Sequence, residues 1–287
     1  MRDRILASPA RNGLVAVLGE FLGTFMFLLF GFISAQTTVL NTRALDLDTS
    51  PEVTTLAPLR LLYIAIAFGT ALAVNVWIFY RVSGGMFNPA VTLGLVLVGA
   101  VPPLRALAIV PAQLAAGIAA TGVVAGLLPG PLLIANELGP QTSVLQGVLL
   151  ETLFTAQLVL TVYFLAVEKH RATFLAPFGI GASVFLGHLA GVGLTGASLN
   201  PARTLGPALF TTFPGYHWIY WVGPFSGAGL AFAVYRLLKW LDYQTANPGQ
   251  DDDDVERLGQ PSASDLGWSR PASEIVTISL PSKQFEK

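Results

Sequence analysis

The sequence predicts an all-helical membrane protein built as two halves of the same design. Three observations predict this fold class. The 287 residues are 53% hydrophobic and only 11% charged, with a mean hydropathy of +0.62, which is too apolar for an ordinary soluble domain. Six apolar stretches are long enough to cross a bilayer. The tripeptide Asn-Pro-Ala occurs twice, each time between small residues and a short apolar run.

The six apolar stretches are the predicted membrane-spanning helices. A hydrocarbon core about 30 Å thick requires roughly 20 apolar residues per helix. The stretches that satisfy this are Gly13–Ala35, Leu59–Tyr80, Leu104–Leu128, Leu145–Val167, Phe174–Leu194 and His217–Leu241. The first is longer than the apolar part of a typical cleavable signal peptide, so we expect it to stay in the membrane.

The distribution of charge predicts the orientation of these helices. Six spans place both termini on the same side of the membrane. The basic residues and histidine on that side are Arg2, Arg4, Arg11, Arg81, Arg105, Lys169, His170, Arg171, Arg236 and Lys239. The loops on the other side carry only Arg43 and Arg60, so the positive-inside rule predicts cytoplasmic termini.

Composition divides the chain into three parts. Residues 1–12 are a short N-terminal segment, and residues 13–241 are the membrane domain, with one repeat at about 13–128 and a second at about 145–241. Residues 242–287 are rich in Asp, Ser, Pro and Gly, which predicts a disordered cytoplasmic tail. The chain has no cysteine, which excludes disulfides, cysteine–zinc sites and thiol catalysis.

Each half contains one glutamate near the start of a membrane helix, Glu20 in "LGEFLGTF" and Glu151 in "LLETLFTA". Each half then continues with a second helix, an Asn-Pro-Ala segment and a third helix. Because each half has an odd number of spans, the second half enters the membrane from the opposite face, and the repeat is inverted. A proton relay would need further carboxylates, so we expect both glutamates to accept hydrogen bonds from loop backbone.

The duplicated segments are "SGGMFNPAVTLG" (Ser83–Gly94) and "TGASLNPARTLG" (Thr195–Gly206). Asparagine is a strong helix N-cap and proline is favoured at the first helical position. The cap, first and second helical residues are therefore predicted to be Asn88, Pro89 and Ala90 in one copy and Asn200, Pro201 and Ala202 in the other. The apolar run that follows spans only about 15 Å, half of the hydrocarbon core. Two re-entrant half-helices are expected to meet near the midplane, preceded by non-helical backbone that lines a cavity.

Both motifs, both glutamates and the arginine that follows the second motif match one pattern. From about Gly13 to Leu241 the chain resembles the aquaporin, or major intrinsic protein, family. The resemblance implies six helices and two half-helices, assembled as a homotetramer with a pore in every subunit. Glycine pairs with GxxxG spacing, such as Gly19 and Gly23, are read as helix packing.

The family resemblance also implies a narrow constriction in the pore. Counted from the motifs, its four positions are Phe68, His188, Ala197 and Arg203. A large aromatic ring and a histidine would leave an aperture about one water molecule wide. Glycerol-conducting members are similar but carry a small residue at the position of His188 and an aspartate at the position of Thr204, so this pattern favours water.

The segments before the motifs are expected to present carbonyl oxygens to a single file of water. The residues are Gly84, Gly85 and Met86 in the first segment and Gly196, Ala197 and Ser198 in the second. The opposite wall is expected to be apolar and to consist of Phe27, Leu72, Leu158 and Val184. The amides of Asn88 and Asn200 are expected to donate to passing water. Met86 and Phe87 stand where many water channels carry a histidine, and their bulk could narrow the cytoplasmic mouth.

The predicted function is a passive, bidirectional water channel that excludes protons and ions, located in the plasma membrane. No catalytic residue, cofactor, metal or nucleic-acid partner is expected. The open alternatives are a glycerol-type channel for small neutral solutes and a non-conducting junctional or scaffold member of the same fold. An intramembrane serine protease is disfavoured because Ser183 and His188, five residues apart on one helix, are separated by about 140° of rotation.

Overall fold

The computed structural model describes residues 9–44 and 53–246, and within these ranges the chain is all-helical. The predicted fold class is confirmed. The helices are α1 (Pro9–Ala44), α2 (Val53–Phe79), α3 (Pro89–Leu97), α4 (Pro103–Leu127), α5 (Val144–Val162), α6 (Ala176–Thr195), α7 (Pro201–Phe210) and α8 (Ile219–Trp240). A π-helical turn (Tyr163–Val167) extends α5, and two short 3-10 helices cover Arg171–Leu175 and Tyr243–Thr245. The tail from residue 247 lies outside the described residues.

Five of the described helices are long and apolar enough to cross a membrane. The apolar segments are Arg11–Asn41, Pro58–Phe79, Pro103–Leu127, Val144–Val167 and Ala172–Thr195. They correspond to the first five predicted spans. The sixth prediction coincides with α8, whose 22 residues extend about 33 Å, enough for one crossing. This helix is less apolar because it contains glycine, serine and tyrosine along its length and two cations in its last turns.

The bundle exposes many large apolar side chains and buries two carboxylates in its interior. Leu107, Phe30 and Trp77 are 72%, 51% and 54% exposed, whereas Glu20 and Glu151 are fully buried. Large apolar surfaces of this kind require a nonaqueous environment. The exposed apolar side chains suit a membrane environment, and the buried polar groups need partners inside the protein.

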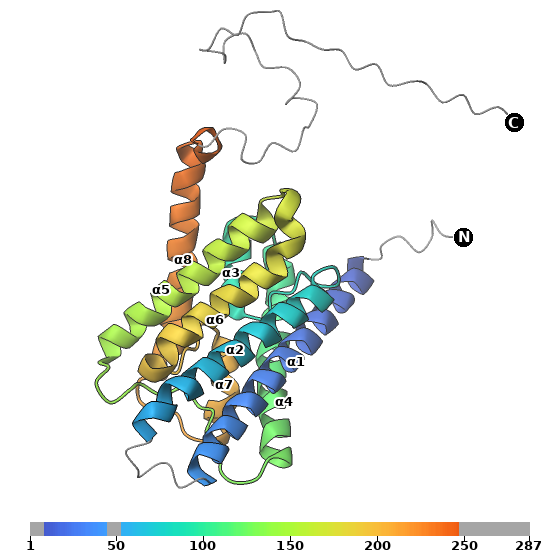
Figure 1. The fold of residues 1–287 in the computed structure, drawn as a ribbon. Helices are drawn as coiled ribbons and strands as arrows, with labels where there is room; N and C mark the ends of the chain where they lie inside the picture. Colours follow the sequence, from blue (N-terminus) through green and yellow to red (C-terminus); the bar gives the residue numbers. More distant parts are fainter. Residues whose placement is uncertain (1–8, 45–52, 247–287) are drawn as a thin grey trace, which may run out of the picture. The chain divides into compact units, whose positions relative to one another are not determined.

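The helices of the two halves pack in matching ways. In the first half α1 contacts α2 and α4, and in the second half α5 makes the equivalent contacts with α6 and α8. Figure 1 shows α5, α6, α2 and α1 side by side in this order, so that α2 and α6 join the halves at the centre of the row. Each short helix packs on a long helix of the other half: α7 packs on α4, and α3 packs on α8.

The short helices α3 and α7 have nine and ten residues, so each extends only about 15 Å. The close packing of α7 on α4 depends on glycine. A Cβ atom at Gly117 would lie 2.2 Å from the carbonyl oxygen of Ala202, and one at Gly206 would lie 2.4 Å from the carbonyl oxygen of Gly117. Each half therefore contributes a half-length helix that sits inside the bundle rather than crossing it.

Beyond the π-helical turn of α5, Glu168 connects the α5–α6 loop to α8. Its Oε1 lies 2.8 Å from Lys239 Nζ and also accepts a hydrogen bond from Tyr235 Oη. Burial alone would raise the pKa of the Glu168 carboxyl, but the hydrogen bonds from Lys239 and Tyr235 outweigh burial and lower it. The contact fixes the end of α5 to the last turns of α8.

Glu168→Gln is expected to lower the thermal unfolding midpoint of the purified protein at pH 7. The loss in free energy of unfolding should be about 1 kcal/mol or less, because the pair is partly exposed. A lowered pKa in the folded state means that the stabilisation is present above the unfolded pKa and is lost as the pH falls through the folded pKa. The gap between wild type and variant should therefore close under acid conditions. A gap that persists at low pH, or that also appears for the exposed Glu137→Gln, would contradict this assignment.

Candidate functional site

The two Asn-Pro-Ala motifs meet face to face at the start of α3 and α7. Asn88 Oδ1 accepts from Ala90 N at 2.8 Å and Asn200 Oδ1 accepts from Ala202 N at 2.9 Å, so each asparagine caps its own helix. Asn88 Nδ2 donates to Leu199 O at 2.7 Å, and Asn200 Nδ2 donates to Phe87 O at 2.9 Å. This reciprocal exchange is the arrangement that an inverted repeat produces. Each amide keeps a second N–H.

Glu20 holds the backbone of the first loop. Its two carboxylate oxygens accept from Ser83 Oγ at 2.6 Å, from Met86 N at 3.0 Å and from Phe87 N at 2.8 Å. Gln113 on α4 donates to the same carboxylate at 2.8 Å. A fully buried carboxylate is stabilised here by four hydrogen bonds, and the loop N–H groups are satisfied by it.

Glu151 repeats the arrangement in the second loop. It accepts from Thr195 Oγ1 at 2.7 Å, Ser198 N at 2.9 Å and Leu199 N at 2.8 Å. The loops need this support because they contain non-glycine residues in the left-handed region, with φ of 53° at Phe87, 49° at Ala197 and 53° at Leu199. Such conformations cost energy and persist only where the surroundings fix them.

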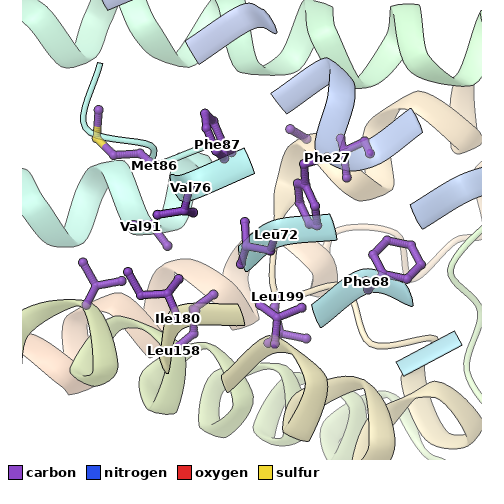
Figure 2. Packing of buried hydrophobic residues seen from close by; sticks show 14 of the residues in the cluster. Phe27, Phe68, Leu72, Val76, Met86, Phe87, Val91, Leu158, Ile180 and Leu199 are labelled. Carbon is purple, nitrogen blue, oxygen red and sulfur yellow. The ribbon is translucent and has the colours of Figure 1, made fainter. Parts of the chain in front are cut away.

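A cavity of about 430 Å³ runs along one side of the two loops. Its wall includes the four predicted apolar residues Phe27, Leu72, Leu158 and Val184, one from each of α1, α2, α5 and α6. Figure 2 shows Phe27, Leu72 and Leu158 in the same cluster as Phe87 and Leu199 of the loops. The predicted carbonyl residues Gly84, Gly85, Met86 and Ser198 also line this cavity, together with both asparagines.

A second cavity, of about 600 Å³, lies beyond the motifs and is lined by Arg60, Glu137 and Gly196 among others. Arg203 is the residue that contributes to both cavities. The predicted carbonyl residue Gly196 therefore borders the second cavity rather than the first. Ala197 and Phe68 are fully buried and line neither of the two.

Phe68 is in close contact with both His188 and Arg203. The rings of Phe68 and His188 are stacked, with centroids 4.4 Å apart, and the Arg203 guanidinium lies 5.4 Å from the centroid of Phe68. Arg203 Nη1 donates to Ile134 O at 2.8 Å. His188 Nδ1 lies 3.0 Å from Val184 O, which assigns the proton to Nδ1 and leaves Nε2 as an acceptor. Among the described residues, Nε2 of His188 and Nε of Arg203 have no hydrogen-bond partner.

Sequence reasoning missed several residues that build this site. Ser83 and Thr195 stand at the same offset before the two motifs and bridge each glutamate to the loop. That matching offset is a signal that alignment of the two halves would have found. Gln113 on α4 and Ile134 and Asn136 in the α4–α5 loop also contact site residues. They lie outside the motifs and have no counterpart in the repeated segments, so the sequence gives no comparable signal for them.

Comparison with known proteins supports the same conclusion as the geometry. The sequence model of the family described as Major intrinsic protein matches residues 9–235. The chain belongs to the major intrinsic protein family. Its members are membrane channels for water or small solutes and not enzymes.

The similar members of the major intrinsic protein family include fungal aquaporins. Aquaporin-1 of Gibberella zeae is 60% identical over 263 residues, which cover 90% of this chain and 81% of that protein. Probable aquaporin-3 of the same organism is 52% identical over 83% of this chain and 82% of its own length. Aquaporin-7 of Botryotinia fuckeliana is 49% identical over 90% of this chain, but the match spans only 57% of that longer protein.

A solved structure of the family has the same fold. The aquaglyceroporin from Plasmodium falciparum matches with a TM-score of 0.63, covering 79% of this chain and 95% of that one, at 20% identity. This identity is too low to transfer selectivity, so the likeness concerns the fold alone. The solute that passes must be inferred from the residues of the constriction.

Proposed function

We propose that this chain is a passive, bidirectional water channel that excludes protons, ions and glycerol. The observation that carries this proposal is the contact of Phe68 with both His188 and Arg203, because His188 lines the first cavity and Arg203 lines both. Two aromatic rings packed beside the guanidinium leave little room for a solute at this point. Pore diameter and the hydrogen-bonding groups that line it determine which neutral solute passes. We expect a constriction crowded by these side chains to pass water and to exclude a three-carbon polyol.

The constriction offers hydrogen-bond donors to a passing molecule through Arg203, which lines both cavities. A guanidinium has five N–H groups, and Nη1 donates to Ile134 O. A water molecule can accept from the N–H groups that remain. These bonds replace part of the hydration that the molecule loses when it enters the narrow site. Water therefore passes without a large desolvation cost.

Proton exclusion follows from the asparagine pair. Each side-chain amide uses its oxygen to cap a helix and one N–H to hold the opposite loop. The second N–H of Asn88 and of Asn200 is then available to a water oxygen in the cavity that both residues line. A water that accepts from both asparagines can only donate to its two neighbours. The hydrogen-bonded file reverses direction there, and a proton cannot hop through it.

Cation exclusion follows from the charge of the pathway. The N-termini of α3 and α7 each carry about +0.5 charge, and they meet at the asparagines. Arg203 adds a full charge at the constriction, and the described residues that line the first cavity include Arg105 and Lys169 but no carboxylate. Aquaporin-type pores are the established example of this kind of exclusion, in which an arginine and half-helix dipoles repel protons and cations.

The environment of the channel is part of the proposal. The exposed apolar belt suits lipid contact and contact with further copies of the chain, and we propose a homotetramer with one pore in each subunit. The cluster of cations on one side of the predicted spans supports cytoplasmic termini. The proposed location is the plasma membrane.

The proposed selectivity is tested with purified protein in lipid vesicles. Water permeability from an osmotic step, glycerol entry from the reswelling phase and proton entry from an internal pH dye are measured on the same preparation. We expect a large gain in water permeability over empty vesicles and no gain for glycerol or protons. Glycerol entry comparable with water flux would instead support the glycerol-type alternative.

The position of Ala197 in the constriction can be tested with mercury. The wild-type chain has no cysteine, so Hg²⁺ is expected to leave its water flux unchanged. If Ala197 belongs to the constriction, Ala197→Cys places a thiol, a soft ligand for mercury, in the pathway, and Hg²⁺ should then block most of the flux until an excess thiol removes it. The exposed Ala115→Cys on α4 is the matched control and should stay insensitive. Insensitivity of Ala197→Cys would remove this residue from the constriction.

A further inference from the structure

Gln36 is an almost fully buried polar side chain outside the motifs and the constriction. It lies on α1, is 1% exposed and directs both ends of its amide at one loop. Its Nε2 donates to Pro131 O and its Oε1 accepts from Leu133 N, each at 2.8 Å. A side chain that matches one donor and one acceptor of a short backbone segment fixes both the position and the direction of that segment.

The loop that Gln36 holds is also the loop that holds the constriction. One residue beyond Leu133, the carbonyl of Ile134 accepts from Arg203 Nη1 at 2.8 Å. Two residues further, Asn136 Oδ1 accepts from Thr204 Oγ1 at 2.7 Å. The connection between α4 and α5 is therefore tied to α1 on one side and to the start of α7 on the other.

A second feature of α1 supports the same arrangement. Phe32 lies one helical turn before Gln36, so both side chains point to the same face of α1. The Arg203 guanidinium lies 5.6 Å from the ring centroid of Phe32, and this ring packs edge-on to Phe68 with centroids 6.2 Å apart. The same face of α1 therefore contacts the aromatic part of the constriction directly and the arginine through the loop.

We propose that Gln36 is a positioning residue for Arg203 and thereby sets the discrimination between water and larger neutral solutes. The inference rests on the proposed function, because it concerns the selectivity of the same pore. Arg203 is a long, flexible side chain, and Nε has no partner among the described residues. Its hydrogen bond to Ile134 O is thus the contact that fixes the guanidinium at one distance from Phe68. Releasing the loop frees the guanidinium to leave the pathway and widens the aperture.

The test is Gln36→Met, which keeps the length and approximate volume of the side chain but removes both hydrogen bonds. Gln157→Met, at an exposed position of α5, is the matched control. The readout is the ratio of glycerol to water permeability in vesicles with equal amounts of monodisperse protein. We expect the ratio to rise about tenfold for Gln36→Met, because release of the loop weakens the charge-assisted hydrogen bond from Arg203 Nη1 to Ile134 O. The ratio should stay at the wild-type value for Gln157→Met.

A merely structural role is distinguished by a double-mutant cycle with Arg203→Val. If Gln36 acts through Arg203, Gln36→Met changes the ratio in the wild-type background and has no further effect once the arginine is gone. An equal rise in both backgrounds would overturn the proposal. If Gln36→Met yields no monodisperse protein, Gln36→Glu replaces it. That change keeps an acceptor for Leu133 N but sets an acceptor oxygen against Pro131 O, so it should also raise the ratio, and an unchanged ratio would again count against the proposal.

The two proposals fail on different data. Wild-type vesicles that conduct no more water than empty ones would overturn the proposed function. A conducting Gln36→Met channel with the wild-type ratio of glycerol to water permeability would overturn the positioning role and leave the proposed function intact.

Discussion

Replacing Glu151 with leucine is expected to prevent accumulation of folded channel. The change leaves Thr195 Oγ1, Ser198 N and Leu199 N buried without their acceptor. Each unpaired buried donor costs about 1–3 kcal/mol, so the sum is roughly 3–9 kcal/mol. A typical protein has a net stability of about 5–15 kcal/mol. The expected loss is therefore comparable with the whole net stability of a typical protein.

The measurement is the yield of monodisperse protein by size-exclusion chromatography, followed by thermal unfolding of what is recovered. Glu151→Gln keeps one acceptor oxygen and should be less damaging than leucine. Glu137→Gln changes an exposed carboxylate at the second cavity and should behave as wild type. Wild-type yield and unfolding temperature for Glu151→Leu would show that the carboxylate does not support the loop.

The double variant His188→Gly with Thr204→Asp is expected to admit glycerol. The glycine removes the ring that stacks on Phe68 and opens the space beside Arg203. Thr204 Oγ1 now contacts Asn136 Oδ1 and Ser198 Oγ, while Asn136 Nδ2 has no partner among the described residues. A rotated Asn136 amide can therefore donate to a carboxylate at position 204. Lowering the barrier by about 1.4 kcal/mol corresponds to a tenfold gain, and we expect a gain on the order of tenfold in glycerol permeability.

Glycerol entry is followed by the reswelling of vesicles after an osmotic step with glycerol. His217→Gly, which changes a histidine outside both cavities, is the control and should leave glycerol excluded. Water permeability should be retained in the double variant, since a wider aperture still passes water. Unchanged exclusion of glycerol in a folded, water-conducting double variant would place the selectivity elsewhere than at His188.

Much of the fold was predictable because each signal is local in the sequence. A helix that crosses the membrane needs a continuous apolar run, and five such runs and α8 coincide with the predicted spans. The starts of α3 and α7 at Pro89 and Pro201 follow from N-cap asparagine and first-turn proline. The glutamate and the motif appear in the same order in both halves, which indicates a repeat, and the odd number of spans in each half then indicates that the repeat is inverted.

What could not be predicted depends on contacts between distant segments. The sequence predicts that the asparagine amides are free for water, whereas one N–H of each holds the opposite loop across more than a hundred residues of chain. Gln36 lies just beyond the first predicted span, and its partners near Leu133 follow no periodic pattern. The π-helical turn after Val162 also escapes periodicity, since its hydrogen bonds depart from the α-helical spacing.

The central claim is that this chain conducts water through its own pore, and stopped-flow light scattering tests it most directly. Vesicles with purified wild-type protein and matched empty vesicles are exposed to the same osmotic step over a range of temperatures. We predict that the protein-containing vesicles shrink much faster and with a weaker dependence on temperature, because a preformed single file replaces the lipid barrier. Shrinkage at the rate and temperature dependence of empty vesicles would contradict the account.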